Sequence, residues 1–285
     1  MKRSITIKAS VLLLAVFPCV AVCSDSNQGD SRKTIDKDHK TKIIAHRGAS
    51  GIAPENTVAS IKLAFEKNAD VAEIDTFLSK DGRVMVIHDE TTKRTAGVDW
   101  VVSKTDSAKL RQLDVGSWKS PDYAGEKIPF LEDIIEVIPE GKELFIDAKY
   151  DPNIVPHLKK VIYASNKKGQ MLIASIKFDV VVACKKQMPD VPVYWGFITE
   201  RDKKTGRYLP YDTAVIEKAV ANGFAGLSLH HKGLTKKYVE KAHKAGLKII
   251  VWTVDGINDA KRLMEYNVDG IATKLPGVIK SHISD

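Results

Sequence analysis

Cysteine is scarce in this sequence. The chain has three cysteines, and Cys19 and Cys23 lie in an apolar N-terminal segment, so only Cys184 belongs to the body of the protein. A single cysteine cannot form an intramolecular disulfide, which excludes a disulfide framework as the source of stability. Cys184 directly follows the apolar residues 180–183 on a segment that we expect to be helical. We therefore interpret it as a packing residue and not as a catalytic thiol.

The sequence also lacks an apolar run that would span a membrane comfortably. Residues 11–22 are apolar, but this stretch is too short and lies too close to charged residues. Together with the basic start at Lys2 and Arg3, it predicts a secretory signal over residues 1–23. Residues 24–41 are polar and show no apolar periodicity, which predicts a flexible tether ahead of the folded domain.

The end of the signal has two interpretations. Val20-Ala21-Val22-Cys23 loosely resembles a bacterial lipoprotein signal, in which the cysteine is lipidated, although Val22 stands where that pattern has a small residue. Simple cleavage and lipidation of Cys23 both stay open. We therefore expect export, either to the periplasm or as a membrane-anchored lipoprotein of the bacterial envelope, with membrane contact only through such a lipid anchor.

A basic stripe interleaved with aromatic residues is also missing. The formal net charge is +8, but the lysines are spread along the chain and many fall on ordinary helix faces. This distribution argues against nucleic-acid binding. An attraction for anionic small molecules is the more natural consequence of the charge, and the pattern carries no indication of an oligomeric state.

Strand-like and helix-like segments alternate through residues 42–285, and no Gly-x-Gly-x-x-Gly turn follows the first strand to indicate a dinucleotide site. The alternation predicts an α/β fold, best fitted by a closed (β/α)8 TIM barrel, with an open doubly wound sheet as the alternative. The expected strands are 42–46, 71–77, 84–88, 143–149, 171–175, 191–197, 223–229, 248–254 and 270–273. Helical spacing is found at 57–68, 131–138, 154–165, 213–222, 235–245 and 257–266.

Nine expected strands exceed the eight places of such a barrel. Asp81-Gly82 between two apolar runs is a hairpin signal, so we assign 84–88 as a strand folded back on 71–77. His88 would then lie roughly opposite Glu73 on one face. Residues 89–130 lack a clear strand and are predicted to form a small insertion over one end of the barrel, with a short helix near 107–113.

Acidic side chains repeat at strand spacing. Glu73 and Asp75 are two residues apart on one strand, so both side chains point the same way, and Asp147 with Lys149 repeats the spacing on another strand. Carboxylates turned into an apolar barrel mouth need a positive partner. Oxygen ligands favour Ca²⁺ or Mg²⁺. We predict a metal site of Glu73, Asp75 and Asp147, with Lys149 available to a phosphate oxygen.

Two histidines end strands that the barrel would direct to its active end. His46 and His88 each follow an apolar run, and a pair of histidines can divide the roles of base and acid at neutral pH. Arg47 can bind a phosphate through two parallel hydrogen bonds. Trp252 offers an aromatic face to a small substrate such as a glycerol backbone, or else packs in the barrel core.

Taken together, these residues resemble the glycerophosphodiester phosphodiesterase family. The stretches that carry the resemblance are His46-Arg47-Gly48, Pro54-Glu55-Asn56-Thr57, Glu73-Ile74-Asp75, Asp81-Gly82, His88-Asp89 with Arg94-Thr95, Ile128-Pro129, Asp147-Ala148-Lys149, Trp252-Thr253-Val254 and Asp269-Gly270-Ile271. The resemblance covers residues 42 to about 280. No single stretch is specific, but the ordered set is.

The resemblance implies a barrel enzyme that hydrolyses glycerophosphodiesters to glycerol 3-phosphate and an alcohol. It implies that His46 and His88 are the acid–base pair and that Glu73, Asp75 and Asp147 hold the divalent ion. It also implies that Arg47, Glu55 and Lys149 line the phosphate and substrate pocket.

The sequence departs from the family pattern at two positions. Asp147 stands where the third metal acid is usually Glu, and Lys274 stands where an Asp usually follows the last strand's threonine. The shorter Asp147 is expected to fall short of a metal unless the strand shifts or a water bridges the gap. Lys274 either favours a more anionic substrate or faces solvent. Two other functions stay open: a phosphodiester lyase of the phospholipase C or sphingomyelinase D type, and a binding protein without turnover.

Overall fold

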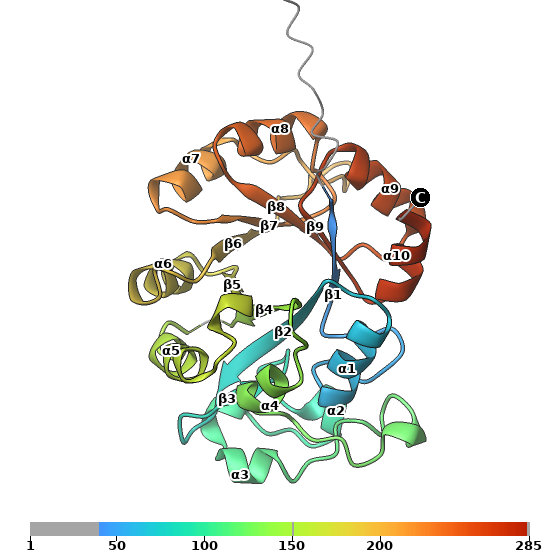
Figure 1. Ribbon diagram of the computed structural model, residues 1–285, viewed down its shortest axis with the longest axis vertical. Helices are drawn as coiled ribbons and strands as arrows, with labels where there is room; N and C mark the ends of the chain where they lie inside the picture. Colours follow the sequence, from blue (N-terminus) through green and yellow to red (C-terminus); the bar gives the residue numbers. More distant parts are fainter. Residues whose placement is uncertain (1–39, 150, 284–285) are drawn as a thin grey trace, which may run out of the picture. The chain divides into compact units, whose positions relative to one another are not determined.

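A closed barrel of parallel strands forms the domain. The computed structural model describes residues 40–149 and 151–283, and the signal predicted over 1–23 lies outside them. One sheet runs in the order β1-β9-β8-β7-β6-β5-β4-β2-β3, and an additional pairing of β1 with β2 closes it (Figure 1). Its strands are β1 Lys42–Ala45, β2 Val71–Leu78, β3 Val84–Val86, β4 Glu143–Ala148, β5 Met171–Ser175, β6 Val193–Phe197, β7 Gly226–His230, β8 Lys248–Trp252 and β9 Gly270–Thr273.

The ninth strand is the predicted hairpin partner. β3 is antiparallel to β2, with Phe77 opposite Met85, whereas the barrel pairings between consecutive strands are parallel. The prediction of a (β/α)8 barrel with one extra strand is confirmed. The strand ends differ by one to three residues, since β1 stops before His46, β3 stops at Val86 and β7 begins at Gly226.

Alternation along the strands divides the apolar side chains into two layers. Residues such as Ile74 and Ile146 face outward into the large core shared with the helices. Phe145, Ala174 and Ile250 belong to a smaller cluster drawn from the strands, which fills the inside of the barrel. Because side chains alternate, Glu73 and Asp75 share the inner face of β2 with Val71, and this brings charge inside the barrel.

Helices surround the strands (Figure 1). They are α1 Val58–Glu66, α4 Leu131–Glu136, α5 Ile154–Ala164, α6 Phe178–Gln187, α7 Ala214–Ala221, α8 Lys236–Lys244, α9 Ile257–Glu265 and α10 Pro276–Ile283. α1 begins at a reciprocal cap, in which the Thr57 hydroxyl accepts from the Ser60 amide and the Ser60 hydroxyl accepts from the Thr57 amide. This cap fixes the start of α1 directly beside the end of β1. α10 was not among the expected helices.

The excursion between β3 and α4 has its own small core. It contains the short helical segments α2 Lys93–Ala96, η1 Val102–Lys104, α3 Ser107–Leu110 and η2 Pro121–Tyr123. Met85, Leu110 and Ile128 are fully or almost fully buried there, in a cluster separate from the main core. This packing holds residues 88–95 against the end of β2.

Among the described residues, no helix is both long enough and apolar enough to cross a membrane. Thr41, at the end of the predicted tether, is buried, and its hydroxyl donates to the Val268 carbonyl at 2.8 Å.

Candidate active site

Three acidic side chains meet inside the barrel mouth. β2 and β4 pair so that Asp75 lies opposite Asp147, and Glu73 precedes Asp75 on the same face. One oxygen from each of the three carboxylates lies within 4.8 Å of the others. Glu73 and Asp75 are 5% and 1% exposed, so this negative charge is almost fully removed from water. Asp147, although shorter than the family's usual Glu, lies within the cluster.

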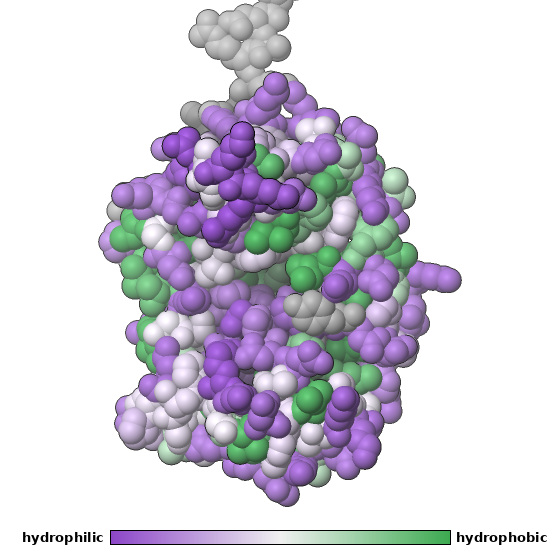
Figure 2. All heavy atoms as spheres, turned by 180° about the vertical axis from the view of Figure 1, so that it is seen from behind, coloured by the Kyte–Doolittle hydropathy of each residue, from purple (hydrophilic) through white to green (hydrophobic). Residues whose placement is uncertain are grey.

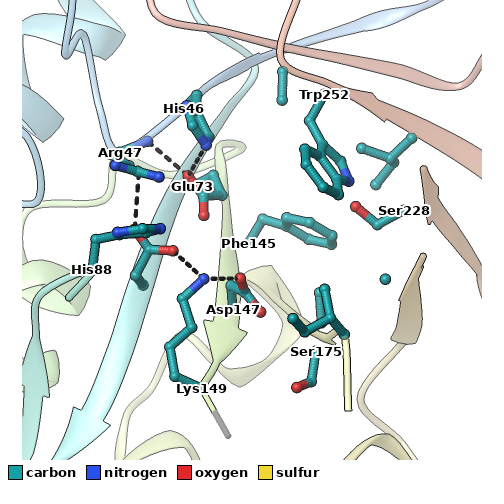
Figure 3. Close-up of a pocket in the computed structure, with 16 residues that line it drawn as sticks. His46, Arg47, Glu73, His88, Phe145, Asp147, Lys149, Ser175, Ser228 and Trp252 are labelled. Atoms are coloured by element: carbon teal, nitrogen blue, oxygen red, sulfur yellow. Dashed lines mark hydrogen bonds and ion pairs between the residues drawn. The ribbon is translucent and has the colours of Figure 1, made fainter. Parts of the chain in front are cut away.

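Two basic side chains neutralise part of this charge. Lys149 Nζ lies 2.8 Å from Asp75 Oδ1 and is also paired with Asp147. Arg47 Nε lies 3.1 Å from Asp75 Oδ2, and the Arg47 amide donates to Glu73 Oε2 at 2.7 Å. Asp75 is therefore held between two cations. Figure 3 shows Lys149 and Arg47 on two sides of the acidic cluster.

The local environment lowers the pKa of one acid of the cluster and raises the pKa values of the other two. Burial would raise the pKa of Asp75, but the charges of Lys149 and Arg47 outweigh it and hold that pKa well below its usual range. Burial raises the pKa of Glu73 well above its usual value, and the neighbouring Asp75 charge adds to this. Burial likewise raises the pKa of Asp147. The cluster thus holds more carboxylate than its two cations stabilise.

The excess of negative charge in this cluster bears on whether a metal ion suits the site. The donor set consists of carboxylate oxygens, which hard divalent cations such as Ca²⁺ and Mg²⁺ prefer. Oxygens from Glu73, Asp75 and Asp147 already converge, and the raised pKa values of Glu73 and Asp147 mark a shortage of positive charge. The residues present therefore fit a divalent cation.

The turn after β1 places Arg47 and His46. Arg47 and Gly48 both adopt left-handed backbone conformations, at φ 56° and 76°. A Cβ on Gly48 would stand 2.4 Å from Ser60 Oγ, so the turn packs against α1 only because this residue is glycine. The turn directs the His46 ring into the pocket, where Nε2 lies 4.0 Å from Glu73 Oε2.

The two histidines have different surroundings. Burial, with the neighbouring Arg47 charge, lowers the pKa of His46 to about 4, which keeps its ring neutral at pH 7. His88 Nδ1 forms a 2.6 Å hydrogen bond with Asp89 Oδ1, so its Nε2 is the nitrogen left for a substrate. Both rings line the same pocket as the acids, as the sequence predicted for strand-end residues.

Glu55 lies behind Arg47. Its carboxylate accepts from Arg47 Nη1 at 3.0 Å and from both terminal nitrogens of Arg94 at 2.9 and 2.7 Å. Arg94 Nε also donates to Asp89 at 2.6 Å. Among the predicted phosphate-pocket residues, Arg47 and Lys149 line the main pocket, whereas Glu55 lines a small adjoining hollow and orients Arg47.

Asn56, Asp89 and Arg94 form contacts that the sequence analysis did not assign to them. Asn56 donates its side-chain amide to Asp75 Oδ2 at 2.9 Å and accepts from the Asp75 amide at 3.1 Å. Asn56 adopts φ 58°, a left-handed conformation that asparagine tolerates better than most residues. The only sequence signal was their presence in stretches that carry the family resemblance, namely Pro54–Thr57, His88-Asp89 and Arg94-Thr95.

The pocket has a charged side and an apolar side. Its volume is about 200 Å³. His46, Arg47, Glu73, His88 and Lys149 lie on one side in Figure 3, and Phe145 and Trp252 lie on the other. Trp252 packs against the inner barrel cluster, as the core interpretation predicted, and also lines the pocket, while its contact with a substrate stays a prediction.

Lys274 lies near the mouth without entering the pocket lining. Its side chain is half exposed, and its Nζ lies 3.9 Å from Asp255 Oδ2. Its charge contributes to the low pKa of His46, after burial and Arg47. In this structure the lysine is paired at the surface and does not reach the acidic cluster.

Comparison with known proteins identifies the family. Residues 46–278 match the Glycerophosphoryl diester phosphodiesterase family. The chain belongs to this family. The match begins at His46 and covers nearly all of the described barrel, so the family predicted from the sequence is confirmed.

Relatives cover most of the chain. A glycerophosphodiester phosphodiesterase from Caldanaerobacter subterraneus is 33% identical over 245 residues, which are 83% of this chain and 95% of the relative. One from Bacillus subtilis is 29% identical over 252 residues, which are 82% of this chain and 83% of the relative. A phosphodiesterase from Oleispira antarctica, solved with the product sn-glycerol-3-phosphate, has a TM-score of 0.78 and 30% identity over 86% of this chain and 97% of that one.

Proposed function

We propose that this chain, an enzyme of the glycerophosphodiester phosphodiesterase family, hydrolyses glycerophosphodiesters to glycerol 3-phosphate and an alcohol with a divalent metal and two histidines. The observation that carries the proposal is the convergence of three carboxylates, two cations and two histidines in one pocket. The Oleispira relative, which was solved with sn-glycerol-3-phosphate, supports the choice of substrate.

Glu73, Asp75 and Asp147 are the residues that would hold Ca²⁺ or Mg²⁺. When bound, such an ion neutralises the phosphodiester and polarises it toward attack. Lys149 and Arg47 flank the same acids, so their charges face the position of the phosphoryl group. They stabilise the negative charge that develops on the phosphoryl oxygens.

The histidines take different roles in this proposal. His46 is neutral at pH 7 because of its burial and the Arg47 charge, so it can accept a proton from the nucleophile. His88 is held by Asp89 and presents Nε2, through which it donates a proton to the leaving alkoxide. The glycerol backbone packs on the apolar side, against Trp252 and Phe145.

The test is a product assay with isosteric histidine variants. Wild-type protein, His46→Gln and His88→Gln are each given glycerophosphocholine with Ca²⁺, Mg²⁺ or EDTA, and release of glycerol 3-phosphate is measured. We expect metal-dependent release that falls about 10²- to 10⁴-fold in either variant. His282→Gln is the matched control, because His282 is exposed on α10 and does not line the pocket.

Phosphorus NMR of the same reactions separates hydrolysis from a lyase route. Glycerol 3-phosphate as the final product supports hydrolysis, whether water attacks directly or a cyclic phosphate forms and is opened. A cyclic phosphate that accumulates as the end product contradicts hydrolysis and favours the lyase alternative. Tight binding of glycerophosphocholine without any turnover favours the binding-protein alternative.

We also propose that the protein is exported, because residues 1–23 have the composition of a secretory signal. Mass spectrometry of the mature N-terminus from expressing cells tests this. A chain that begins at or near Cys23 supports export, and an acyl mass on Cys23 supports the lipoprotein form. An uncleaved chain that begins at Met1 and is found in the cytoplasmic fraction contradicts export.

A further inference from the structure

A second hollow opens beside the catalytic pocket. Its volume is about 460 Å³. It is formed by the loops after β6 and β7 and by α9, which follows β8, so it lies at the same end of the barrel as the strand-end catalytic residues. Its polar and charged lining consists of Arg201, Arg207, Tyr208, His231, Lys232 and Arg262, and we name it the distal basic pocket.

Stacked aromatic rings connect the two pockets. Trp252 lines the catalytic pocket, and its ring centroid lies 5.4 Å from that of His230, edge to face. His230 in turn stacks on Tyr208 of the distal basic pocket at 4.7 Å. Trp252, His230 and Tyr208 thus form a continuous series of ring contacts from the catalytic pocket to the distal basic pocket.

Arg201 contacts Tyr208 at the edge of the distal basic pocket. Its guanidinium lies 4.4 Å from the Tyr208 ring centroid, and its Nη2 donates to the Tyr208 hydroxyl at 2.5 Å. Arg201 and Tyr208 also form a backbone bridge that closes the loop after β6 into a hairpin. The hairpin places Arg207 and Tyr208 next to each other on the rim.

The lining has more positive than negative charge. Arg262 is paired with Asp259 at 2.7 Å, and Asp259 lies 4.0 Å from His231 Nδ1. Within residues 40–149 and 151–283, Arg207 and Lys232 have no acidic partner within 4.0 Å. Asp202, the nearby acid of the hairpin, accepts hydrogen bonds from the hairpin's own amides.

The effect of this charge is visible at His230. Burial, together with the charges of His231, Lys232 and Arg201, lowers the pKa of His230 to about 4. Figure 2 shows one face of the molecule with a central hollow, and strongly hydrophilic residues gather above it. The positively charged side chains that line the distal basic pocket attract an anion.

We propose that the distal basic pocket binds a phosphate carried by the alcohol part of the diester, so that the preferred substrates are glycerophosphodiesters with a phosphorylated alcohol. This rests on the proposed function, since it places the scissile phosphate in the catalytic pocket and the second phosphate in the distal one. Guanidinium groups match the geometry of phosphate oxygens, and the unpaired Arg207 and Lys232 supply the charge.

Two ligands that differ by one phosphate test the proposal. Binding of glycerophosphoinositol and glycerophosphoinositol 4-phosphate to the full protein is measured by titration calorimetry in EDTA, which suppresses metal-dependent turnover. Wild-type protein is expected to bind the phosphorylated ligand about tenfold more tightly. In the double variant Arg207→Gln/Lys232→Gln that ratio is expected to fall to within about twofold. Equal affinities in the wild type overturn the proposal.

A matched control lies in the same hairpin. Lys203→Gln/Lys204→Gln removes the same amount of charge from residues that do not line the distal basic pocket. This variant is expected to keep the wild-type ratio. If the control instead loses the affinity ratio of the two ligands as fully as Arg207→Gln/Lys232→Gln does, the overall positive charge of the protein, and not the distal basic pocket, causes the preference. In that case the proposal is overturned.

Other sources of the anion give different results. Inorganic phosphate that binds the wild type as tightly as glycerophosphoinositol 4-phosphate would assign the pocket to a free ion and overturn the proposal. The proposal is also overturned if the two soluble ligands bind with equal affinity while the protein binds phosphatidylglycerol vesicles through Arg207 and Lys232. Cleavage of glycerophosphoinositol is measured separately: its absence with every metal contradicts the proposed function, while the affinity ratio still decides on the distal basic pocket.

Discussion

Two isosteric substitutions in the acidic cluster are expected to have different effects on stability, since one should destabilise the fold and the other should not. Asp75→Asn and Glu73→Gln each remove one negative charge from the inner face of β2 and keep the side-chain volume. Asp75 lies between Lys149 at 2.8 Å and Arg47 at 3.1 Å. Glu73 accepts a hydrogen bond from the Arg47 amide, but burial and the Asp75 charge disfavour its ionised form.

The expected sizes follow from these surroundings. Asp75→Asn leaves two nearly buried cations without their shared counterion, and removing one partner of a buried ion pair costs about 3–5 kcal/mol. For a domain of this length that corresponds to a fall in melting temperature of roughly 6–20 °C. Glu73→Gln removes a charge whose folded-state pKa is raised, so at pH 7 it removes a cost, and its amide oxygen still accepts from Arg47. We expect Glu73→Gln to leave the melting temperature unchanged or to raise it.

The assay is thermal unfolding at pH 7 in EDTA, followed by circular dichroism. Asp99→Asn is the control, since its ion pair with Lys93 is exposed and spans 3.6 Å, and such pairs contribute about 0–1 kcal/mol. Addition of Ca²⁺ or Mg²⁺ should raise the melting temperature of the wild type by mass action and raise that of Glu73→Gln less. Equal destabilisation by the two cluster variants in EDTA would refute the electrostatic reasoning.

Three further outcomes follow from the described contacts. Gly226→Ala should abolish folding, because its Cβ would stand 2.2 Å from a backbone carbonyl oxygen, while Gly169→Ala has open space and should be neutral in soluble yield and melting temperature. Asp81→Ala should cost about 1 kcal/mol at pH 6 by removing hydrogen bonds to Ser107. Because hydrogen bonds lower the pKa of Asp81 to about 2, its contribution is complete above pH 3.8 and is lost as the pH falls through 2, so denaturation midpoints of variant and wild type should converge there. Burial raises the pKa of Cys184 to about 12, so peptide mapping should find this thiol unlabelled at pH 8 until denaturant is added.

The barrel was predictable because its strands are short, apolar and separated by helical spacing. The hairpin was also predictable, since the five residues between Leu78 and Val84, which include Asp81-Gly82, leave no room for a helix. Strand ends were less predictable, because a strand ends where its residues no longer pair with residues of the neighbouring strand. α10 was missed because Pro276-Gly277 resembles a turn, although proline is well suited to the first turn of a helix.

Strand alternation and pairing predicted only the site residues that strands position, and the loop residues Arg47 and Glu55 were predicted from side-chain chemistry and the family resemblance. Period-two alternation is sufficient to bring Glu73 and Asp75 to one face, and parallel pairing aligns Asp147 with them. The contacts of Asn56 and Arg94 depend on how the loop after β1 and the excursion after β3 fold back. No local pattern encodes such a meeting of distant loops, so their roles had to come from the structure.

The distal basic pocket illustrates the same limit. Its charges lie on two loops and one helix that are separated by about 60 residues in the sequence. The sequence shows only scattered basic residues, and only the barrel's circular order brings Arg207, Lys232 and Arg262 together. The net charge predicts only a general attraction for anions, whereas the structure shows where on the barrel the basic side chains gather.

The most direct test of the central claim is the rate of glycerol 3-phosphate release from glycerophosphocholine as Ca²⁺ or Mg²⁺ is returned to EDTA-treated protein. The account predicts that release is absent without metal, rises to saturation as metal is added, and stays near background in Glu73→Gln, although that variant is folded. Release at the full rate in EDTA, or in Glu73→Gln, would contradict a metal held by Glu73, Asp75 and Asp147. No release by folded wild-type protein with any metal or glycerophosphodiester would contradict the proposed activity itself.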